Sequence, residues 1–395
     1  MRILFVVQRY GHEVGGGAEL HCRQFATHLA DRGHDVEALT SCAVSYLTWE
    51  NHYAPGTEAL DGVVVHRLPV SSPRNFRFFS PLDARAVWGN KPVPLFLQEA
   101  WMRAQGPVIP ELAPWLLDHS ERFDVVVFFT YLYYTTWAGL PAAAALRPTV
   151  LHPTAHDEPP LYLPLFSLTV RHASAFAFST EEESRLFSGR FRVARPSSVI
   201  GIGTDLDVDA DGDQFRSAYG LEEDPYLLFV GRVDPHKGSD ELYDFFTTYK
   251  ELNPGPLRLV FLGDAVKPLP SHPDVITTGF VDDSVRLSAM AGCRALVQPS
   301  YFESFSMVLS EAWVMRKPAL VQGHCEVLVG QALRSEGAIP YKGFAEFEAA
   351  VNLLQDSPKV AEGLGARGRA YVEARYSWGT VMTNYEELLA STAIA

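Results

Sequence analysis

The chain contains little cysteine and no surplus of positive charge, and each shortage excludes a class of protein. Lys and Arg total 33 against 47 Asp and Glu, and the net charge of −14 argues against a nucleic-acid-binding protein. The few cysteines have no C-x-x-C pair and no disulfide-like spacing, which is typical of reduced, mostly buried thiols in a cytosolic protein. They are Cys22, Cys42, Cys293 and Cys325.

Long apolar segments are also scarce. Residues 3–7 are too short for the apolar core of a signal peptide. Residues 125–146 carry no charge and are about long enough to span a bilayer, but they include Gly139-Leu-Pro141 and several Thr and Tyr residues. We expect a buried strand, a loop and a short Ala-rich helix there. The predicted location is the cytoplasm, with the inner face of the membrane left open.

Several nucleotide-binding and hydrolase signatures are missing. The first strand is not followed by a strict G-x-G-x-x-G, and the second ends in Thr40-Ser41 instead of an acidic ligand for a ribose. Both features argue against a dinucleotide-dependent oxidoreductase. The chain also has no Walker A lysine motif and no G-x-S-x-G nucleophile elbow.

Short apolar segments alternate with helical stretches in two series, separated by the acidic stretch 205–213. This alternation predicts parallel sheets covered by helices on both faces. The fold class is therefore α/β, with two doubly wound Rossmann-like domains whose carboxyl strand ends face a central cleft, where ligands bind. The expected strands are 3–7, 36–40, 63–68, 125–129, 149–152, 175–179 and 199–202, then 226–230, 257–262, 275–278, 295–298 and 319–322.

The polar break predicts domains over 1–205 and 206–375, followed by a C-terminal segment 376–395. Residues 71–121 interrupt the first series and are rich in Pro, Phe and Trp. They form either an insertion that recognises an acceptor or amphipathic helices packed on the N-terminal domain. Residues 1–205 hold 17 basic and 20 acidic side chains, so this nearly neutral half leaves room for an anionic or lipid-linked acceptor.

The acidic stretch 205–213 invites a calcium-binding interpretation. Aligning Asp207, Asp209 and Asp211 with an EF-hand loop places Ala218 where a bidentate Glu is needed. We therefore interpret the stretch as an interdomain linker and expect no metal site.

Two carboxylates, Glu303 and Glu311, are separated by seven residues after the expected strand 295–298. If a helix begins near residue 304, Glu311 lies about two turns into it, and the pair can meet opposite ends of one elongated ligand. The first-turn amides then point unpaired at the middle of that ligand. These amides include those of Ser306, Met307 and Val308. The arrangement suits a nucleotide sugar, with hydroxyls at both ends and phosphates between them.

A second element follows the expected strand 226–230. The apolar run ends at Gly231, and Arg232 and Lys237 lie in a short turn before a helix. Two cations just beyond a buried strand predict a diphosphate clamp, because each ion pair at about 4 Å is worth roughly 4 kcal/mol at a protein-like dielectric. Surface salt bridging is the alternative. Gly263 ends the strand 257–262, where it shapes a nucleotide pocket or a plain turn.

A third element, Gly15-Gly16-Gly17-Ala-Glu19, lies between the first strand and a periodic helix. Adjacent glycines let backbone amides approach a phosphate or sugar closely, so Gly16 and Gly17 are expected near the diphosphate. Glu19 is expected as a first-turn helix carboxylate.

Together these segments resemble the retaining glycosyltransferases of family 4, the glycosyl transferases group 1, which have the GT-B architecture. The resemblance covers nearly the whole chain, through GGAE at 16–19, GRVDPHKG at 231–238, the E-x₇-E pair and a terminal Tyr376-Ser-Trp-Gly, in the family's order. The chain departs from the family at Ser304 and Ser306, where glycine is common, and at Arg316, where a glycine normally precedes the lysine.

The resemblance implies a metal-independent transfer, with retention, of a hexosyl group from a nucleoside diphosphate sugar to a hydroxyl acceptor. The setting would be polysaccharide or other glycan biosynthesis, with no cofactor beyond the donor. The nucleotide sugar would bind the C-terminal domain. A carbohydrate, lipid-linked or small-molecule acceptor would bind the N-terminal domain, to which the last helix would cross back.

The resemblance also assigns roles to single residues. His156, in Leu151-His-Pro-Thr-Ala-His156 after a strand, would contact the transferred sugar. Glu303 would bind sugar hydroxyls and Glu311 the ribose hydroxyls. A phosphate oxygen would take the proton of the acceptor, so no side-chain nucleophile is required.

Three other functions stay open. A natural-product glycosyltransferase is compatible with the aromatic segment, and a GT-B sugar-nucleotide 2-epimerase or a non-catalytic nucleotide-sugar-binding subunit of a glycan assembly shares the fold. The E-x₇-E spacing and the glycine turn favour transfer, and the complete set of carboxylates, cations and His156 favours an enzyme. No nucleic-acid partner is expected, and peripheral association with a membrane is left open.

Overall fold

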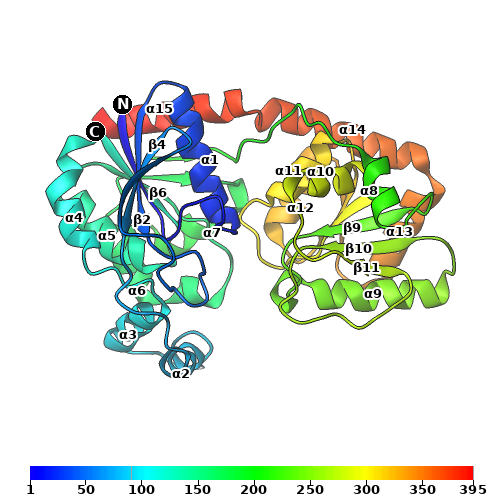
Figure 1. Ribbon diagram of the computed structural model, residues 1–395, viewed down its shortest axis with the longest axis horizontal. Helices are drawn as coiled ribbons and strands as arrows, with labels where there is room; N and C mark the ends of the chain where they lie inside the picture. The colour runs from blue at the N-terminus through cyan, green and yellow to red at the C-terminus, as the bar shows by residue number, and fades with distance from the viewer. Residues whose placement is uncertain (90, 395) are drawn as a thin grey trace. The chain divides into compact units, whose positions relative to one another are not determined.

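Apolar strands form two separate sheets, and the chain divides into two α/β units around them. Unit 1 comprises Met1–Gly201 together with the C-terminal segment from Val381, and unit 2 comprises Ile202–Thr380. The computed structural model (Figure 1) describes residues 1–89 and 91–394. Each unit is a doubly wound arrangement of a mainly parallel sheet between helices, as the sequence predicts.

The sheet of unit 1 has eight strands in the order β3-β4-β2-β1-β5-β6-β7-β8. All neighbours are parallel except β3 and β4, which form an antiparallel hairpin at the edge. The central strands are buried along their whole length, which is why their sequences are continuously apolar. The strands are β1 (Arg2–Val6), β2 (Asp35–Ser41), β3 (Gly56–Leu60), β4 (Val63–Leu68), β5 (Val125–Phe129), β6 (Thr149–His152), β7 (Ala175–Phe178) and β8 (Ser197–Val199).

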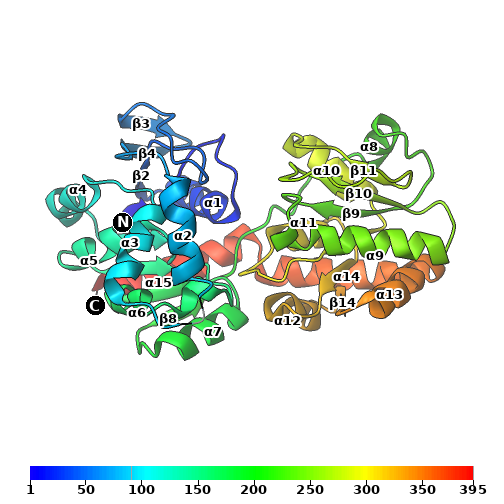
Figure 2. The same ribbon diagram turned by 90° about the horizontal axis from the view of Figure 1, so that it is seen from below.

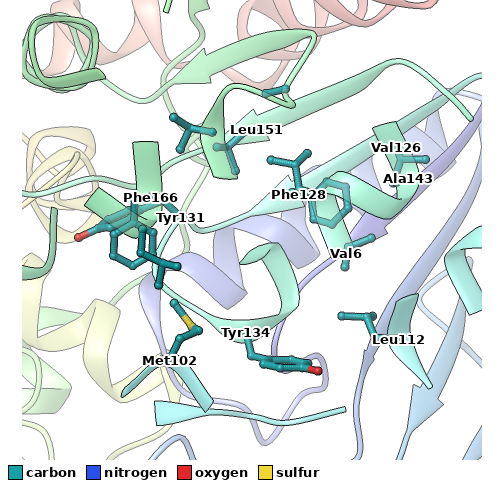
Figure 3. Packing of buried hydrophobic residues seen from close by; sticks show 14 of the residues in the cluster. Val6, Met102, Leu112, Val126, Phe128, Tyr131, Tyr134, Ala143, Leu151 and Phe166 are labelled. Atoms are coloured by element: carbon teal, nitrogen blue, oxygen red, sulfur yellow. The ribbon is translucent and has the colours of Figure 1, made fainter. Parts of the chain in front are cut away.

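Helices cover this sheet and share a core with it. Figure 3 shows Val6 of β1, Phe128 of β5 and Leu151 of β6 among the buried side chains of this core. The uncharged segment 125–146 is β5, a loop and α5, as expected. The helices of unit 1 are α1 (Gly17–Asp31), α2 (Phe76–Ala86), α3 (Leu95–Gln105), α4 (Leu112–His119), α5 (Tyr134–Ala144), α6 (Pro164–Val170), α7 (Glu181–Phe191) and α15 (Trp378–Ile394), with short 3₁₀ turns η1 (Ser120–Arg122) and η2 (Pro159–Tyr162).

The aromatic region 71–121 forms α2, α3 and α4. Trp101 and Met102 of α3 are fully buried in the core of unit 1, and Phe79 and Trp115 pack against that core from its edge. The region is therefore a set of amphipathic helices packed on unit 1. Whether it recognises an acceptor stays a prediction.

The C-terminal helix α15 belongs to unit 1 from Val381 onward. The hydroxyl of Tyr385 lies 2.9 Å from Nε2 of the buried His152 in β6. Glu386 pairs with Arg32 at 2.7 Å and with His34 at 2.9 Å, at the end of α1. These contacts tie the end of the chain to its first helix and to the middle of the sheet.

The sheet of unit 2 has six parallel strands in the order β11-β10-β9-β12-β13-β14. Figure 1 shows α9 on one side of this sheet and α10 and α11 on the other. The strands are β9 (Tyr226–Val230), β10 (Arg258–Leu262), β11 (Val275–Thr277), β12 (Ala295–Gln298), β13 (Ala319–Gln322) and β14 (Ala338–Tyr341). The helices are α8 (Gly212–Ala218), α9 (Ser239–Leu252), α10 (Asp283–Gly292), α11 (Met307–Val314), α12 (Glu326–Ser335), α13 (Phe344–Asp356) and α14 (Pro358–Arg375), with the 3₁₀ turn η3 (Pro235–Lys237).

Three strands differ from the expectation. The prediction missed β3, because its residues are exposed and lack an apolar pattern. It also missed β14, a strand at the edge of the sheet, where Pro340 is tolerated. The strand expected over 199–202 is β8 at Ser197–Val199, a partly exposed edge strand with little apolar signal.

Within residues 1–89 and 91–394, we find no helix whose length and apolar character would allow it to cross a membrane.

Candidate active site

Predicted site residues follow three neighbouring strands of unit 2. β10, β9 and β12 lie side by side in that order. Gly231 and Arg232 follow β9, Gly263 follows β10, and Glu303 lies in the loop after β12. Because parallel strands end at one edge of their sheet, the topology gathers segments that are far apart in the sequence.

An ion pair joins the turn after β9 to the loop after β12. Nζ of Lys237 lies 2.7 Å from Oε1 of Glu303, with the lysine 38% and the glutamate 12% exposed. Gly238 permits this approach, because a Cβ there would lie 2.3 Å from the carbonyl oxygen of Pro299 and its φ of +74° favours glycine. An ammonium group has three hydrogens, so Lys237 can bind a second anion beside Glu303.

Arg232 is held by a neighbour in the same turn. Its Nε donates to Oδ2 of Asp234 at 2.8 Å, and the arginine side chain is 40% exposed. Oδ1 of Asp234 accepts the backbone N–H of His236 at 2.9 Å and so caps η3. One carboxylate therefore fixes both the turn and the guanidinium. Since a guanidinium has five N–H donors, Arg232 can bind an anion in addition to Asp234.

Close backbone contact explains why a glycine occupies position 263. A Cβ at this position would lie 2.1 Å from the carbonyl oxygen of Gly231, and its φ is +136°. The N–H of Gly231 donates to the carbonyl of Leu262 at 2.9 Å. Both glycines thus have a structural role at the end of their strands, and their contact with a nucleotide stays a prediction.

The helix that carries Glu311 begins later than expected. α11 begins at Met307 instead of residue 304, so Glu311 is its fifth residue and lies little more than one turn in. The expectation of two turns is therefore wrong. The delay follows from Ser306, whose φ of +75° is left-handed and whose Oγ accepts from Nε2 of Gln298 at 2.8 Å. The backbone N–H groups of Met307 and Val308 are in the first turn, where no intrahelical acceptor exists.

Glu311 has a charged partner that the sequence analysis did not identify. Nη1 of Arg286, on α10, forms a short hydrogen bond and ion pair with Oε2 of Glu311, and its Nε donates to Asp283 at 3.0 Å. Burial raises the pKa of Glu311, and the charge and hydrogen bond of Arg286 oppose that rise. Arg286 therefore keeps the carboxylate in place.

The glycine turn of unit 1 is fixed from inside by a buried ion pair. Nη2 of Arg9 lies 2.6 Å from Oε1 of Glu19, which is in the first turn of α1 as expected, and also donates to the carbonyl of Gly15 at 2.9 Å. Gly16 has a φ of +148°, and a Cβ there would lie 2.3 Å from Oε2 of Glu19. A Cβ at Gly17 would have no neighbour within 4 Å. Gly16 is thus required by the fold, and Gly17 leaves open space beside the turn.

His156 lies in the loop after β6, at the carboxyl edge of the sheet of unit 1. Its Nδ1 is 3.7 Å from Oε1 of Glu158, which accepts a hydrogen bond from the hydroxyl of Tyr131 at 2.9 Å. Tyr131 follows β5, the neighbouring strand. The imidazole is partly exposed and lies beside Glu158, which Tyr131 holds from the neighbouring strand end.

A buried carboxylate supports this loop. Oε1 of Glu183 accepts the backbone N–H of Ala155 at 2.8 Å, and Oε2 accepts that of Ser179 at 2.6 Å. Burial raises the pKa of Glu183 to about 7, although these hydrogen bonds oppose the rise. Glu183 thus connects the start of α7 to the residue that precedes His156. The sequence analysis missed it, because it lies in an ordinary run of first-turn glutamates.

In the acidic stretch, the side chain of Asp211 caps α8 by accepting the N–H groups of Asp213 and Gln214. Across residues 1–89 and 91–394, no three His, Cys, Asp or Glu side chains are grouped so that they could hold a metal ion.

Comparison with known families covers the candidate residues of both units. The model of the family described as glycosyl transferases group 1 matches residues 211–369, and that of the glycosyl transferase 4-like domain matches residues 16–203. Together they span most of the chain. The chain belongs to the group 1 glycosyltransferases of family 4. The family predicted from the sequence is confirmed.

Individual relatives agree with this assignment. The chain is 26% identical over 402 residues to a D-inositol 3-phosphate glycosyltransferase of Stackebrandtia nassauensis, across 92% of this chain and 84% of the relative. A sucrose-phosphate synthase from Thermosynechococcus elongatus superposes with a TM-score of 0.72 at 17% identity, over 99% of each chain. HepE of Anabaena in complex with UDP-glucose superposes with a TM-score of 0.69 at 18% identity, over 99% of this chain and 100% of HepE. The GT-B fold class is confirmed.

Two of the three departures from the family's glycines, Ser306 and Arg316, lie in left-handed backbone. Ser306 has a φ of +75° and Arg316 a φ of +57°. These are conformations that glycine adopts without strain, which explains why glycine is common there. This glycosyltransferase adopts left-handed backbone at both positions although neither residue is glycine.

Proposed function

We propose that this glycosyltransferase moves a hexosyl group, with retention and without a metal ion, from a nucleoside diphosphate sugar to a hydroxyl acceptor. Unit 2 would bind the donor and unit 1 the acceptor. The observation that carries the proposal is the Lys237–Glu303 pair, at 2.7 Å, at the carboxyl edge of the sheet of unit 2. The pair places a cation, which can bind a diphosphate, next to a carboxylate, which can bind sugar hydroxyls. In a nucleotide sugar, the diphosphate and the sugar are directly bonded neighbours.

The diphosphate would lie against Lys237, Arg232 and the first amides of α11. Lys237 and Arg232 each have a carboxylate partner, so the turn is close to neutral before the donor binds. Binding would add phosphate oxygens to donors already held in place. Such fixed donors stabilise the charge that develops on a leaving diphosphate, because they need not reorganise during the reaction.

The nucleoside end would be recognised by Glu311. Its carboxylate is positioned by Arg286 and can accept hydrogen bonds from two adjacent ribose hydroxyls. Glu303, which precedes the start of α11 in the chain, would accept hydrogen bonds from the sugar.

The transfer balances without a protein nucleophile. The bond between the anomeric carbon and the β-phosphate oxygen breaks, and its electron pair leaves with the diphosphate. The acceptor oxygen forms the new bond on the same face of the oxocarbenium-like sugar. Its proton passes to a phosphate oxygen. His156, whose Nδ1 lies 3.7 Å from Oε1 of Glu158, would contact the transferred sugar from unit 1.

The setting to test first is glycan assembly in the cytoplasm. The first donor to test is UDP-glucose, because the structurally similar HepE was solved with it. A thermal-shift screen of UDP-, GDP-, ADP- and dTDP-sugars identifies the donor, since a selective ligand raises the unfolding temperature by mass action. With that donor, NMR of the product should show the anomeric configuration of the donor. An inverted product would contradict the retaining mechanism.

Two further results separate this function from its rivals. A C2-epimerised sugar released without an acceptor would identify an epimerase, and donor binding without turnover across an acceptor panel would identify a binding subunit. EDTA should leave the initial rate unchanged, because the two cations and the helix amides would balance the phosphate charge. A loss of rate that added Mg²⁺ or Mn²⁺ restores would contradict metal independence.

A further inference from the structure

The helices α2 and α3 expose large apolar side chains that the proposed transfer does not use. The two helices contact each other and lie side by side in both views of unit 1 (Figures 1 and 2). Five exposed apolar side chains occur within residues 76–96 and form what we call the α2–α3 patch: Phe76, Phe78, Trp88, Leu95 and Phe96. Phe78, Trp88 and Phe96 are 60%, 59% and 67% exposed. Several large exposed apolar side chains on two contacting helices and the segment between them are typical of an interaction surface.

The two helices that carry the patch are fixed by buried contacts. On its inner side Trp101 is buried, and its indole N–H donates to Oδ1 of Asp83 at 2.8 Å, which ties α3 to α2. Oε1 of Gln98 accepts the backbone N–H of Leu165 at 2.9 Å and ties α3 to α6. Phe76, Phe78 and Phe96 therefore lie on packed helices. Trp88 follows α2, and its indole N–H donates to Oδ2 of Asp83 at 3.2 Å.

The patch is also basic within an acidic chain. Residues 71–105 contain five Lys or Arg and two Asp or Glu, whereas the whole chain has a net charge of −14. Arg77, Arg85 and Lys91 are exposed and alternate in the sequence with the exposed aromatic residues. Two copies of the chain meeting through this surface would bring like charges together, which opposes a symmetric dimer.

We infer that the α2–α3 patch docks on an anionic phospholipid bilayer. Short amphipathic helices with Phe and Trp on one side and Lys or Arg beside them bind at the level of the headgroups. Each cation near an anionic surface contributes about fivefold in affinity. Charge and aromatic composition therefore select an anionic lipid surface over a neutral one.

Docking would bring the acceptor side of unit 1 close to the lipid. α3 contacts α6, which follows the loop of His156. A lipid-linked acceptor could then present its hydroxyl from the headgroup layer. This consequence rests on the proposed function, whereas bilayer binding itself does not.

The test is co-sedimentation of the full chain with large vesicles. One preparation contains phosphatidylcholine alone, and the other contains equal parts of phosphatidylcholine and phosphatidylglycerol. The aromatic variant is Phe78→Ser with Phe96→Ser. The matched control is Leu252→Ser with Leu333→Ser, which removes two exposed apolar side chains from unit 2. The unfolding temperature of each variant confirms that it is folded.

We expect the wild type and the control to sediment with the anionic vesicles, and only weakly with the neutral ones. The aromatic variant should partition about tenfold less, and Arg77→Gln with Lys91→Gln should reduce binding to the anionic vesicles only. A wild type that stays in the supernatant, or an aromatic variant that binds like the control, would overturn the inference. A dimer that the aromatic variant dissociates, without vesicle binding, would overturn it too. Nucleotide-sugar binding measured on the same preparations shows whether the proposed function stands independently.

Discussion

Replacing Lys237 with alanine removes the cation from the pair that supports the proposed donor site. The change leaves Glu303, which is only 12% exposed, without its partner and facing the position assigned to the diphosphate. The variant therefore loses an attraction and gains a repulsion between like charges. Both effects act on the donor and on the departing diphosphate. We therefore expect a large fall in the turnover number and only a small change in the free energy of unfolding.

The structure sets the size of each effect. Removing one fixed donor from a developing anion costs about 3 kcal/mol of transition-state stabilisation, so kcat should fall about 100- to 1,000-fold. Because Lys237 is 38% exposed, its pair with Glu303 contributes less than about 1 kcal/mol to the free energy of unfolding. The double variant Lys237→Ala with Glu303→Gln removes the repulsion as well, and it should bind the nucleotide more tightly than the single variant.

The assay measures release of the nucleoside diphosphate with saturating donor and acceptor, and calorimetry measures nucleotide affinity. Lys359→Ala is the matched control, because Lys359 is exposed on α14, away from the strand ends. The control should behave as the wild type. A Lys237→Ala variant with a wild-type kcat, or one that loses activity only because it unfolds, would refute the reasoning.

The remaining predictions concern the helix start, the glycine turn and the buried carboxylate. Glu311→Gln should weaken nucleotide binding about tenfold in calorimetry with little change in kcat at saturation, because it removes an acceptor of the ribose and the partner of Arg286. Gly16→Ala should lower the free energy of unfolding in urea by about 1–3 kcal/mol, whereas Gly17→Ala, which meets open space, should change it by less than about 0.5 kcal/mol. For Glu183, the folded pKa of about 7 lies above the ordinary 4.5, so the folded state binds the proton more tightly. The free energy of unfolding should therefore rise as the pH falls from about 7 to about 4.5, by up to about 3 kcal/mol relative to Glu183→Gln.

Each of these predictions has a contradicting result. Unchanged nucleotide affinity in Glu311→Gln would exclude the ribose role. Equal urea curves for the two alanine variants would mean that the turn can relax around a Cβ at Gly16. For Glu183, parallel pH profiles of the wild type and Glu183→Gln would show that this carboxyl does not titrate in the expected range.

Much of the fold could be predicted from the sequence, because its signals are local and strong. Continuously apolar strands such as β5 and β9 are buried on both faces, and their burial requires that pattern. The edge strands β3 and β14 escaped prediction for the opposite reason, since a strand at the edge of a sheet needs neither full burial nor a backbone donor at every residue. The start of α11 was misplaced because its position depends on the left-handed Ser306, and serine gives no sign of that conformation.

The site could be predicted only in part. Lys237 and Glu303 carry local motifs, but their contact depends on β9 and β12 being neighbours, which is a property of the sheet. Arg286 and Glu183 lie in ordinary helical sequence. The contacts that give them their roles, with Glu311 and with the N–H of Ala155, join residues that are remote in the chain. Only the tertiary contacts of Arg286 and Glu183 reveal these roles.

The most direct test of the donor site is a crystal structure of the chain with the bound nucleoside diphosphate. We predict phosphate oxygens within hydrogen-bond distance, about 3 Å, of Nζ of Lys237 and of the guanidinium of Arg232, at the carboxyl edge of the sheet of unit 2. A nucleotide bound elsewhere, with both side chains turned to bulk water, would contradict the account.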